Sequence, residues 1–492
     1  MTAFAQPVHP ALVPGLAQPT DLLIGGAWRG SATGRRLDVN DPATGTVLTS
    51  VADADPQDGV AAVDAAAAAA AEWAATSPRH RAGVLMRAFD LMQERSEALA
   101  RLISLENGKA LGDARAEVSY AAEFFRWYAE EGVRLRGQLG TAPSGANRLL
   151  VSYQPVGVSV LVTPWNFPAA MATRKIAPAV AAGCTTVLKP AAETPLTALA
   201  VAALLEEAGL PAGVVNVVTT SSPGSVVEAM LTHERTRMVS FTGSTEVGRR
   251  LLRQAADNVL KCSMELGGNA PFIVFGDADL DKALDGIMVA KMRNGGQACT
   301  AANRIYVERG LHEEFARRLA ARMGALTVGP GTEETTEVGP LVDGASVQKV
   351  DELVRDAVAQ GAELLLGGAA PERSGHYYQP TVLGNVPARA RMVAEEIVGP
   401  VASVIPFDTE AEAIAAANGS EYGLAAYVFT EDLARALKVA ERIESGMVAI
   451  NRGLVSDPAA PFGGSKHSGL GREGAHQGLL EFTETKYIAL DW

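Results

Sequence analysis

Four runs of β-branched and apolar residues follow one another closely between residues 156 and 255, and each run leads into a loop. Their sequences are VGVSVLVTPWNFP (156–168), AAGCTTVLKP (181–190), GVVNVVT (213–219) and TRMVSFTGSTEVGRRLLRQA (236–255). In the last run the loop continues directly into a helical pattern. Strands that alternate with loops and helices in this way favour a parallel sheet, whose ligand lies beyond the carboxyl ends of the strands. The pattern predicts a Rossmann-type dinucleotide-binding sheet.

A second series of strands is predicted in the carboxyl-terminal half of the chain. Strand-like runs occur at residues 303–308, 362–368, 401–407 and 424–430, and helical stretches such as LHEEFARRLAARM (311–323) separate them. A chain of 492 residues is too long for one ordinary core, so two or three domains are expected. The predicted fold class is therefore α/β.

The two ends of the chain carry different signals. Residues 59–75 and 79–107 have helical propensity or helical apolar spacing, and Gly108 is expected to end the second of these helices. The first twenty residues contain no lysine or arginine and are interrupted by prolines, which predicts a disordered or loosely attached tail. The final stretch, TETKYIALDW, reads as a strand that pairs either with another subunit or within its own chain.

Composition narrows the possible partners. The net charge of −13 argues against general binding to nucleic acid or to an anionic membrane. No apolar run approaches the length of a membrane span. The three cysteines form no CxxC pair and the seven histidines show no metal-ligand spacing, so neither a disulfide framework nor a metal site is expected. A cytoplasmic location follows by default.

Cys299 is the residue whose surroundings most suggest chemistry. It lies among small, uncharged residues in NGGQACTAANR (294–304). Glycines allow other atoms to approach the backbone, and small side chains leave room for a substrate, so the setting suits a thiol nucleophile. The alternative is a buried structural cysteine in a tight turn, because free cysteine is among the most buried residue types.

Two further motifs contain candidate catalytic groups. Glu265 in KCSMELGGNAP lies between apolar residues and glycines, where desolvation would raise the carboxyl pKa toward that of a general base. Asn166 in TPWNFP lies between aromatic residues and prolines, and a rigidly held amide can stabilise an oxyanion. The alternatives are a helix-capping or surface glutamate and an ordinary asparagine in a proline-flanked turn.

A glycine loop completes the set. In FTGSTEVG, Gly243 and Gly248 lie between a strand and a helix, where backbone N–H groups can receive a pyrophosphate. The spacing is neither GxGxxG nor a Walker A motif. Thiol, carboxylate, amide and dinucleotide sheet together suit aldehyde oxidation: the thiol gives a hemithioacetal, hydride leaves to nicotinamide, and water activated by the base releases the acid from a thioester.

These strings resemble the aldehyde dehydrogenase superfamily over nearly the whole chain, from about Asp21 to Trp492. The matching strings, in the family's order, are TPWNFP, KP, FTGSTEVG, MELGGNAP, NGGQAC, EEIVGP and PFGGSKHSGLGREG. By this resemblance Cys299 is the nucleophile, Glu265 is the general base, and Asn166 with the Cys299 backbone N–H forms the oxyanion hole. Lys175 resembles the family's lysine that helps relay protons near the base.

The resemblance also implies the domain organisation. It consists of a Rossmann-type dinucleotide-binding domain, an α/β catalytic domain and a small β oligomerisation flap that joins subunits into homodimers or homotetramers. The expected division is an amino-terminal tail (1–20), the NAD(P)-binding domain (21–138 and 156–265), the catalytic domain (266–450), a return segment lining the active site (451–477) and the flap (139–155 and 478–492).

The implied cofactor is NADP or NAD. The residues implied to bind it are Thr163, Trp165, Lys189, Ala192, Gly243, Ser244, Gly248, Leu266 and Glu396. Many NAD-using relatives have a glutamate where this chain has Ala192, and a carboxylate there would repel a 2′-phosphate, so its absence favours NADP. Glu193, one residue later, partly restores the acid.

The implied substrate is a small aldehyde with a distal carboxylate. The succinate-semialdehyde branch of the family binds that carboxylate through two arginines and a serine, which Arg174, Arg293 and Ser456 resemble. Guanidinium groups bind carboxylates in bidentate fashion. The alternative is that either arginine forms a surface ion pair. Some members also carry a second cysteine two residues after the nucleophile, but that position is Ala301 here, so a redox-switch disulfide is not expected.

Other functions remain open at this stage. Glutarate or 2-oxoglutarate semialdehyde is the nearest alternative substrate, because a carboxylate clamp fixes charge better than chain length. A cysteine hydrolase would pair Cys299 with a histidine such as His467 or His476. A non-catalytic scaffold that has kept the fold is the third possibility.

Overall fold

An eight-stranded sheet contains the predicted strand series of residues 156–255. The computed structural model describes residues 12–491. The strand order is β2-β1-β9-β8-β7-β10-β11-β21, and the strands comprise Ala27–Arg29, Leu22–Ile24, Val215–Val217, Thr185–Lys189, Val158–Val162, Thr236–Thr242, Lys261–Glu265 and Gly469–Leu470. The five strands from β9 to β11 are parallel. Because β8 and β9 lie on one side of β7 and β10 on the other, the topological switch point, where α/β sheets bind ligands, lies between β7 and β10.

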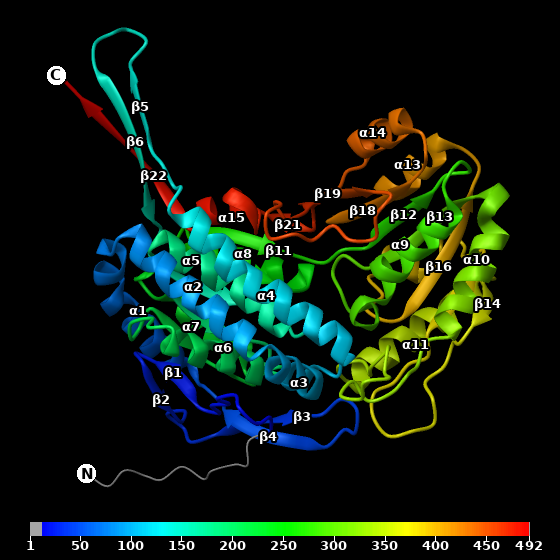
Figure 1. Ribbon diagram of the computed structural model, residues 1–492, viewed down its shortest axis with the longest axis horizontal. Helices are drawn as coiled ribbons and strands as arrows, with labels where there is room; N and C mark the ends of the chain where they lie inside the picture. Colours follow the sequence, from blue (N-terminus) through cyan, green and yellow to red (C-terminus); the bar gives the residue numbers. More distant parts are fainter. Residues whose placement is uncertain (1–11, 492) are drawn as a thin grey trace.

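Helices cover both faces of this sheet (Figure 1). One face packs against α1 (Pro56–Ala75), α7 (Pro223–Thr232) and α8 (Thr245–Asp257), with a core of valine, leucine and methionine side chains. The other face packs against α5 (Pro168–Ala182) and α6 (Pro195–Glu207), and α2, α3 and α4 pack outside these two. The sheet is therefore shielded from water on both sides, which agrees with its nearly uninterrupted apolar strands.

A seven-stranded sheet forms the second lobe. Its order is β14-β15-β16-β13-β12-β18-β19, and the strands comprise Glu363–Leu366, Thr381–Gly384, Val401–Phe407, Ala302–Glu308, Ala270–Val274, Ala425–Phe429 and Met447–Ile450. All neighbouring pairs are parallel except β14 with β15. The core on one face includes α9 (Leu280–Met292) and α10 (Arg309–Gly324), and the core on the other includes α11 (Gly344–Ala359), α13 (Glu410–Asn418) and α14 (Leu433–Arg442).

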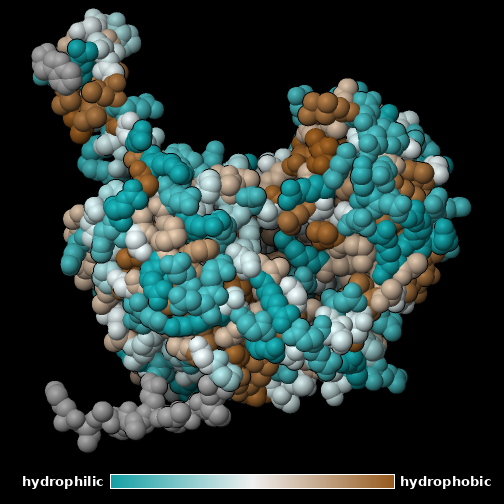
Figure 2. All heavy atoms as spheres, in the orientation of Figure 1, coloured by the Kyte–Doolittle hydropathy of each residue, from teal (hydrophilic) through white to brown (hydrophobic). Residues whose placement is uncertain are grey.

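A three-stranded sheet projects from the first lobe as an arm (Figure 1). It consists of β22 (Thr483–Leu490), β6 (Arg148–Pro155) and β5 (Gln138–Thr141), all antiparallel. The terminal strand therefore pairs within its own chain here. Leu139 and Tyr487 on this arm are 63% and 56% exposed, and Figure 2 shows apolar atoms at its surface.

Short elements complete the fold. The strands β3 (Arg36–Asn40) and β4 (Val47–Ala52) pair with each other, as do β17 (Tyr422–Gly423) and β20 (Ser465–Lys466). Helix α12 covers Arg391–Ala394, and a 3-10 turn covers Arg293–Gly296. Helix α15 (Ala475–Glu481) packs on α4 and α5, so the chain returns from the second lobe to the first.

The helix predicted over residues 79–107 is in fact two helices. Helix α2 covers Pro78–Glu94 and α3 covers Ser96–Asn107, with a break at Arg95. The break lets α3 turn so that it packs against both α4 (Leu111–Gly132) and α6. The predicted stop is confirmed, because Gly108 ends α3 in the left-handed conformation with a φ of 87°.

The predicted loose tail is wrong for the residues that the structure describes. Val13 and Leu16 are 3% and 6% exposed and belong to the core of the first lobe. Their apolar side chains gain more from burial than a mobile segment would gain in entropy. The first eleven residues of the predicted tail lie outside the described residues.

The remaining element predictions are confirmed. All eight strand-like runs of the two series contain strands, and the alanine-rich stretch lies within α1. None of the helices within residues 12–491 combines the length and the apolar character needed to cross a bilayer.

Gly108 supplies the first testable prediction. An alanine there is strained at positive φ, and its Cβ would lie 2.7 Å from Pro340 Cγ. We expect Gly108→Ala to lower the free energy of unfolding by about 1–2 kcal/mol or more, measured as a fall in the thermal midpoint. The control is Gly112→Ala in the first turn of α4, whose Cβ meets no atom within 4 Å, so it should be neutral or slightly stabilising. Equal midpoints for the two variants would contradict this account.

Candidate active site

Cys299 follows a tight turn whose conformation depends on two glycines. After α9, residues Asn294, Gly295 and Gly296 all have positive φ angles, and a Cβ on Gly296 would lie 2.1 Å from the Gly399 carbonyl oxygen. A Cβ on Gly268, between β11 and β12, would lie 2.5 Å from the carbonyl oxygen of Cys299 itself. The thiol is therefore carried on a loop packed tightly between the carboxyl ends of the strands of the first large sheet and the amino ends of β12, β13 and β16 in the second.

The side chain of Cys299 is half-buried and lines a small pocket rather than the protein core. The pocket measures about 60 Å³, and α4, α5, the 3-10 turn and the segment 456–462 contribute its walls. All three predicted substrate residues lie in it with Cys299. Its lining residues are Asp113, Ala116, Glu117, Tyr120, Phe167, Met171, Arg174, Arg293, Cys299, Thr300, Ser456 and Phe462. The alternative of a purely structural cysteine has no support in this placement.

The electrostatic surroundings of the thiol connect it with the other candidate residues. Burial raises the pKa of Cys299 to about 11, and Arg174 opposes this increase. The nearby carboxyl groups of Glu396 and Glu265 raise the thiol pKa further, and Arg293 lowers it. The thiol is therefore protonated near neutral pH in the ligand-free protein, and a base must take its proton before it can attack.

Glu265 occupies the last residue of β11 and is 2% exposed, so it is neither a surface nor a helix-capping glutamate. Within the described part of the chain, neither of its carboxyl oxygens has a hydrogen-bond partner. Burial and the neighbouring Glu473 raise its pKa well above the usual value, against the opposing effect of Arg174 and Lys175. Once ionised, such a carboxylate is a strong base.

Glu473 is a central residue of the site that the sequence analysis missed. Its carboxylate accepts hydrogen bonds from Arg174 Nε and Lys175 Nζ, and all three side chains are at most 5% exposed. Burial raises the pKa of Glu473, but the two cations outweigh this effect and hold it below the usual value. A signal was present, because Glu473 in LGREG, like Glu265 in MELGG, is a carboxylate beside glycine.

Arg174 and Lys175 are neighbours on α5 with different surroundings. Lys175 Nζ also donates to Ser240 Oγ at 2.9 Å. The Arg174 guanidinium lies 4.1 Å from the Phe462 ring centroid. Among residues 12–491, its Nη2 group has no hydrogen-bond partner although it is buried. Arg174 is therefore not a surface ion pair: one edge is fixed by Glu473, and Nη2 is left for a ligand.

Asn166 lies in the loop between β7 and α5. Its Nδ2 donates to the carbonyl oxygen of Gln297 at 3.2 Å, two residues before the nucleophile. An amide nitrogen carries two hydrogens, so this bond orients the side chain and leaves a second donor. The structure thus brings Asn166 next to the loop of Cys299.

A crevice of about 430 Å³ lies at the carboxyl ends of β7, β8 and β10. Six of the nine predicted cofactor residues line it, and these are Thr163, Trp165, Lys189, Ala192, Gly243 and Ser244. Arg250 also lines the crevice, which the sequence analysis did not predict. This position at the switch point of the sheet is where α/β proteins bind dinucleotides.

The crevice has the features that a dinucleotide requires. Ser244 is the N-cap of α8, so the helix begins at the crevice with its N–H groups and its positive dipole end. A Cβ on Gly248 would lie 2.4 Å from Leu266 Cδ2, so this glycine permits the close approach of α8 to the end of β11. Burial lowers the pKa of Lys189 to about 8, and Glu193 opposes this shift.

Glu396 lies beside Gly267, close enough to Cys299 for its charge to act on the thiol. Its Oε2 would be 3.1 Å from a Cβ on Gly267. Burial raises the pKa of Glu396 to about 7, against the opposing charge of Lys349. The three predicted cofactor residues that do not line the crevice are Gly248, Leu266 and Glu396. Gly248 packs against Leu266 at the end of β11, and Glu396 lies near Cys299.

The two histidines considered as partners of the thiol lie elsewhere. His467 contacts Glu421 at 2.7 Å and Arg249 at 2.8 Å, and His476 contacts Glu131 at 2.6 Å. Among the described residues, no histidine lines the pocket of Cys299, and no three His, Cys, Asp or Glu side chains are grouped as a metal site.

Comparison with known proteins places this geometry in a family. The model described as "Aldehyde dehydrogenase family" matches residues 28–488. The chain belongs to this family. A succinate-semialdehyde dehydrogenase of Paenarthrobacter nicotinovorans is 55% identical over 90% of this chain and 99% of its own. A glutarate-semialdehyde dehydrogenase of Pseudomonas putida is 48% identical over 95% and 97%. A crystal structure of an Escherichia coli NADP-dependent enzyme shares 48% identity with a TM-score of 0.95, covering 96% and 98% of the two chains.

The raised pKa of the thiol gives a prediction of pH dependence. Only the thiolate is alkylated, and its fraction rises about tenfold per pH unit below the pKa. The alkylation rate of Cys299 in this aldehyde dehydrogenase, without cofactor, should therefore rise about 100-fold between pH 7 and 9. The measurement is iodoacetamide labelling followed by peptide mass spectrometry, which separates Cys299 from Cys184 and Cys262. A rate that reaches its plateau below pH 8 would show that the thiol pKa is lowered instead.

Proposed function

We propose that this aldehyde dehydrogenase oxidises succinate semialdehyde to succinate with NADP or NAD as the hydride acceptor. The observation that carries the proposal is the small pocket in which Cys299 lies with Arg174, Arg293 and Ser456. It supplies a nucleophile and an anion-binding group within reach of one short molecule.

Unpaired donors in this pocket support an anionic substrate. Arg174 Nη2 and the Tyr120 hydroxyl are both buried without a hydrogen-bond partner within the described chain, and both side chains line the pocket. Buried polar groups are ordinarily paired. A carboxylate between them would satisfy both, and it would offset the positive charges of Arg174 and Arg293.

The size of the pocket favours a short substrate. The cavity beside Cys299 is small, at about 60 Å³, which favours a short aldehyde over a long or branched one. One similar protein is named a succinate-semialdehyde dehydrogenase and another a glutarate-semialdehyde dehydrogenase. Glutarate semialdehyde, one methylene longer, is therefore the second candidate substrate, because one methylene changes specificity by only about 10- to 200-fold.

We propose the following roles for the residues that touch the reacting atoms. Cys299 Sγ bonds to the carbonyl carbon, the π electrons move to oxygen, and the Asn166 amide with the Cys299 N–H stabilises the oxyanion. Glu265, when ionised, takes a proton from the thiol and later from water. The hydroxide attacks the thioester, the C–S bond breaks with its electrons returning to sulfur, and the acid is released. Lys175 and Glu473 offer a path for the proton toward Ser240.

The nicotinamide cofactor supplies the hydride acceptor between these two stages. Lys189 and Gly243 with the α8 N-terminus would hold its ribose and phosphates, together with Thr163, Trp165, Ala192, Ser244, Gly248, Leu266 and Glu396. The absence of a carboxylate at Ala192 and the presence of Arg250 in the crevice both favour NADP. The crystal structure compared above, with a TM-score of 0.95, is described as that of an NADP-dependent enzyme.

We also propose the domain boundaries given above, assembly as a homodimer or homotetramer, and a cytoplasmic location. The two large sheets and the three-stranded arm agree with a cofactor domain, a catalytic domain and a flap. The exposed apolar residues of the arm agree with assembly through the flap.

The nucleophile is tested with Cys299→Ala. We expect production of NADPH or NADH from succinate semialdehyde to be abolished, because the covalent step needs sulfur, whereas NADP binding measured by calorimetry should stay within about twofold of wild type. Two further measurements examine the other classes of function, namely ester turnover without cofactor and aldehyde oxidation by the wild-type protein. Cofactor-independent ester turnover that disappears in His467→Ala or His476→Ala would favour a hydrolase, and a wild-type protein that binds NADP but oxidises no aldehyde would favour a scaffold.

The anion pocket is tested with a pair of matched substrates. We expect kcat/KM for succinate semialdehyde to exceed that for butanal, and Arg293→Ala to lower it by about 10- to 100-fold, since a charged hydrogen bond contributes about 1.5–3 kcal/mol. The value for butanal should change little, which controls for damage to the fold. NADP and NAD are compared in each assay, with NADP expected to give the higher kcat/KM. The pocket assignment is wrong if butanal or hexanal is the better substrate.

A further inference from the structure

We propose that Lys109 and Glu117 are positioning residues, which hold the loop of Asn166 and the start of α5 so that the Asn166 amide faces Cys299. Neither residue belongs to the predicted catalytic, cofactor or substrate sets. The inference rests on the proposed role of Asn166 as an oxyanion donor. It assigns a function to a buried ion pair that the reaction itself does not use.

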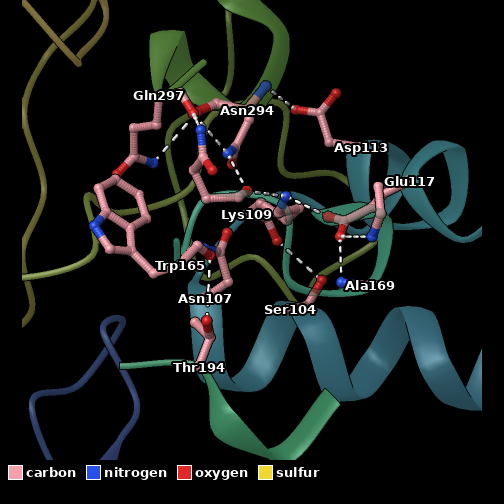
Figure 3. A network of polar contacts seen from close by, with 12 residues as sticks. Ser104, Asn107, Lys109, Asp113, Glu117, Trp165, Ala169, Thr194, Asn294 and Gln297 are labelled. Atoms are coloured by element: carbon pink, nitrogen blue, oxygen red, sulfur yellow. Dashed lines mark hydrogen bonds and ion pairs between the residues drawn. The ribbon is translucent and has the colours of Figure 1, made fainter. Parts of the chain in front are cut away.

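The backbone of the Asn166 loop is held through its carbonyl oxygens. The Trp165 oxygen accepts a hydrogen bond from Asn107 Nδ2 at 2.9 Å, and the Asn166 oxygen accepts one from Lys109 Nζ at 2.7 Å. Figure 3 shows these donors entering from the connection between α3 and α4. Two consecutive peptide groups are thus fixed from the same side, which leaves little freedom for the side chain between them.

Lys109 and Glu117 form the centre of this network. Lys109 Nζ lies 2.5 Å from Glu117 Oε2, and both side chains are fully buried. The same ammonium lies 4.1 Å from the ring centroid of Phe167, the residue after Asn166. One cation therefore contacts Glu117, the Asn166 backbone and the Phe167 ring at once.

Glu117 also fixes the start of the next helix, α5. Its Oε1 accepts hydrogen bonds from the backbone N–H groups of Ala169 at 2.8 Å and Ala170 at 3.3 Å. The N-cap residue of α5, Phe167, offers no side-chain cap of its own. Glu117 thus replaces the missing cap, and α5 is the helix that carries Arg174 and Lys175.

The nucleophile loop, residues 294–299, is hydrogen-bonded to the same Asn166 carbonyl oxygen. Asn294 Nδ2 donates to the Asn166 carbonyl oxygen at 2.8 Å, and Asp113 accepts the Asn294 N–H at 2.8 Å (Figure 3). In the other direction, Asn166 Nδ2 donates to the Gln297 carbonyl oxygen. Lys109 and the nucleophile loop therefore share the Asn166 oxygen, so a shift of Lys109 would move the amide relative to Cys299.

Stability alone does not account for this pair. A buried ion pair can often be replaced by apolar residues of similar volume with little loss of stability, because desolvation offsets the attraction between the charges. What apolar residues cannot replace is the hydrogen bond to the Asn166 oxygen and the cap on α5. A misplacement of about 1 Å near the chemistry can reduce a rate about 100-fold.

The test compares Lys109→Met, Glu117→Leu and the double variant Lys109→Met/Glu117→Leu. We expect the double variant to recover the thermal midpoint that the single variants lose, while its kcat stays about 10- to 100-fold below wild type. KM for the aldehyde, the dissociation constant for NADP and the alkylation rate of Cys299 should change less than about threefold. A double variant with a recovered midpoint and wild-type kcat would overturn the proposal, because kcat would then follow stability.

Two further variants keep the test decisive if the double variant does not fold. Glu117→Gln preserves the shape and one acceptor for α5 but removes the ion pair, and we expect kcat to fall at least fivefold with KM nearly unchanged. The matched control is Asp58→Asn, since Asp58 is also a buried, ion-paired carboxylate that accepts backbone N–H groups, on α1. It should lower the midpoint but not kcat. An unchanged kcat in Glu117→Gln, or an equal loss in Asp58→Asn, overturns the inference.

The outcome also separates this inference from the proposed function. If the wild-type protein oxidises no aldehyde, the proposed function fails and the positioning role fails with it. If the wild-type protein is active but all the Lys109 and Glu117 variants retain its kcat, only the positioning role fails.

Discussion

The buried carboxylate of Glu473 is the interaction on which the chemistry of the site depends. It bonds to Arg174 and Lys175, two adjacent cations on α5 that would otherwise lie together in a dry interior. An unpaired charge there would be strongly destabilising. Because Glu473 follows the second lobe and α5 belongs to the first, this ion triad also fixes the return of the chain across the site.

The same triad sets the protonation of the groups beside it. The negative charge of Glu473 raises the pKa of Glu265, while Arg174 and Lys175 lower it. Arg174 acts on the Cys299 thiol in the same direction. The ligand-free site therefore holds its thiol protonated near neutral pH and keeps the pKa of its general base raised. The net effect of the charges on either group depends on what occupies the pocket. A substrate carboxylate near Arg174 would partly offset the positive charge of this arginine. The pKa values of Cys299 and Glu265 would then rise further.

Local sequence was sufficient for the strands, for the Gly108 stop and for the residues of the glycine-rich loops. Runs of β-branched residues and glycine turns carry their conformational preference within a few positions. The failures have a different origin. The break at Arg95 depends on how α3 packs against α4 and α6. Burial of Val13 and Leu16 depends on a core built elsewhere, and Glu473 meets Arg174 across 299 positions of sequence. Tertiary packing decides each of these, so no short pattern predicts them.

The site lies where two independent constraints meet at one residue. The switch point of the first sheet fixes the crevice, because the connections that follow β7 and β10 lead to helices on opposite faces of the sheet. The connection after β7 is the loop of Asn166. The glycine turn of residues 294–296 fixes the nucleophile, because it packs against the Gly399 backbone of the second lobe. The Asn166 carbonyl oxygen accepts a hydrogen bond from Asn294 Nδ2 in this turn, and the Asn166 side chain donates to the carbonyl oxygen of Gln297, just after it. The Asn166 peptide thus links the crevice with the loop of Cys299, and the buried Lys109, which is paired with Glu117, donates to the carbonyl oxygen of this peptide.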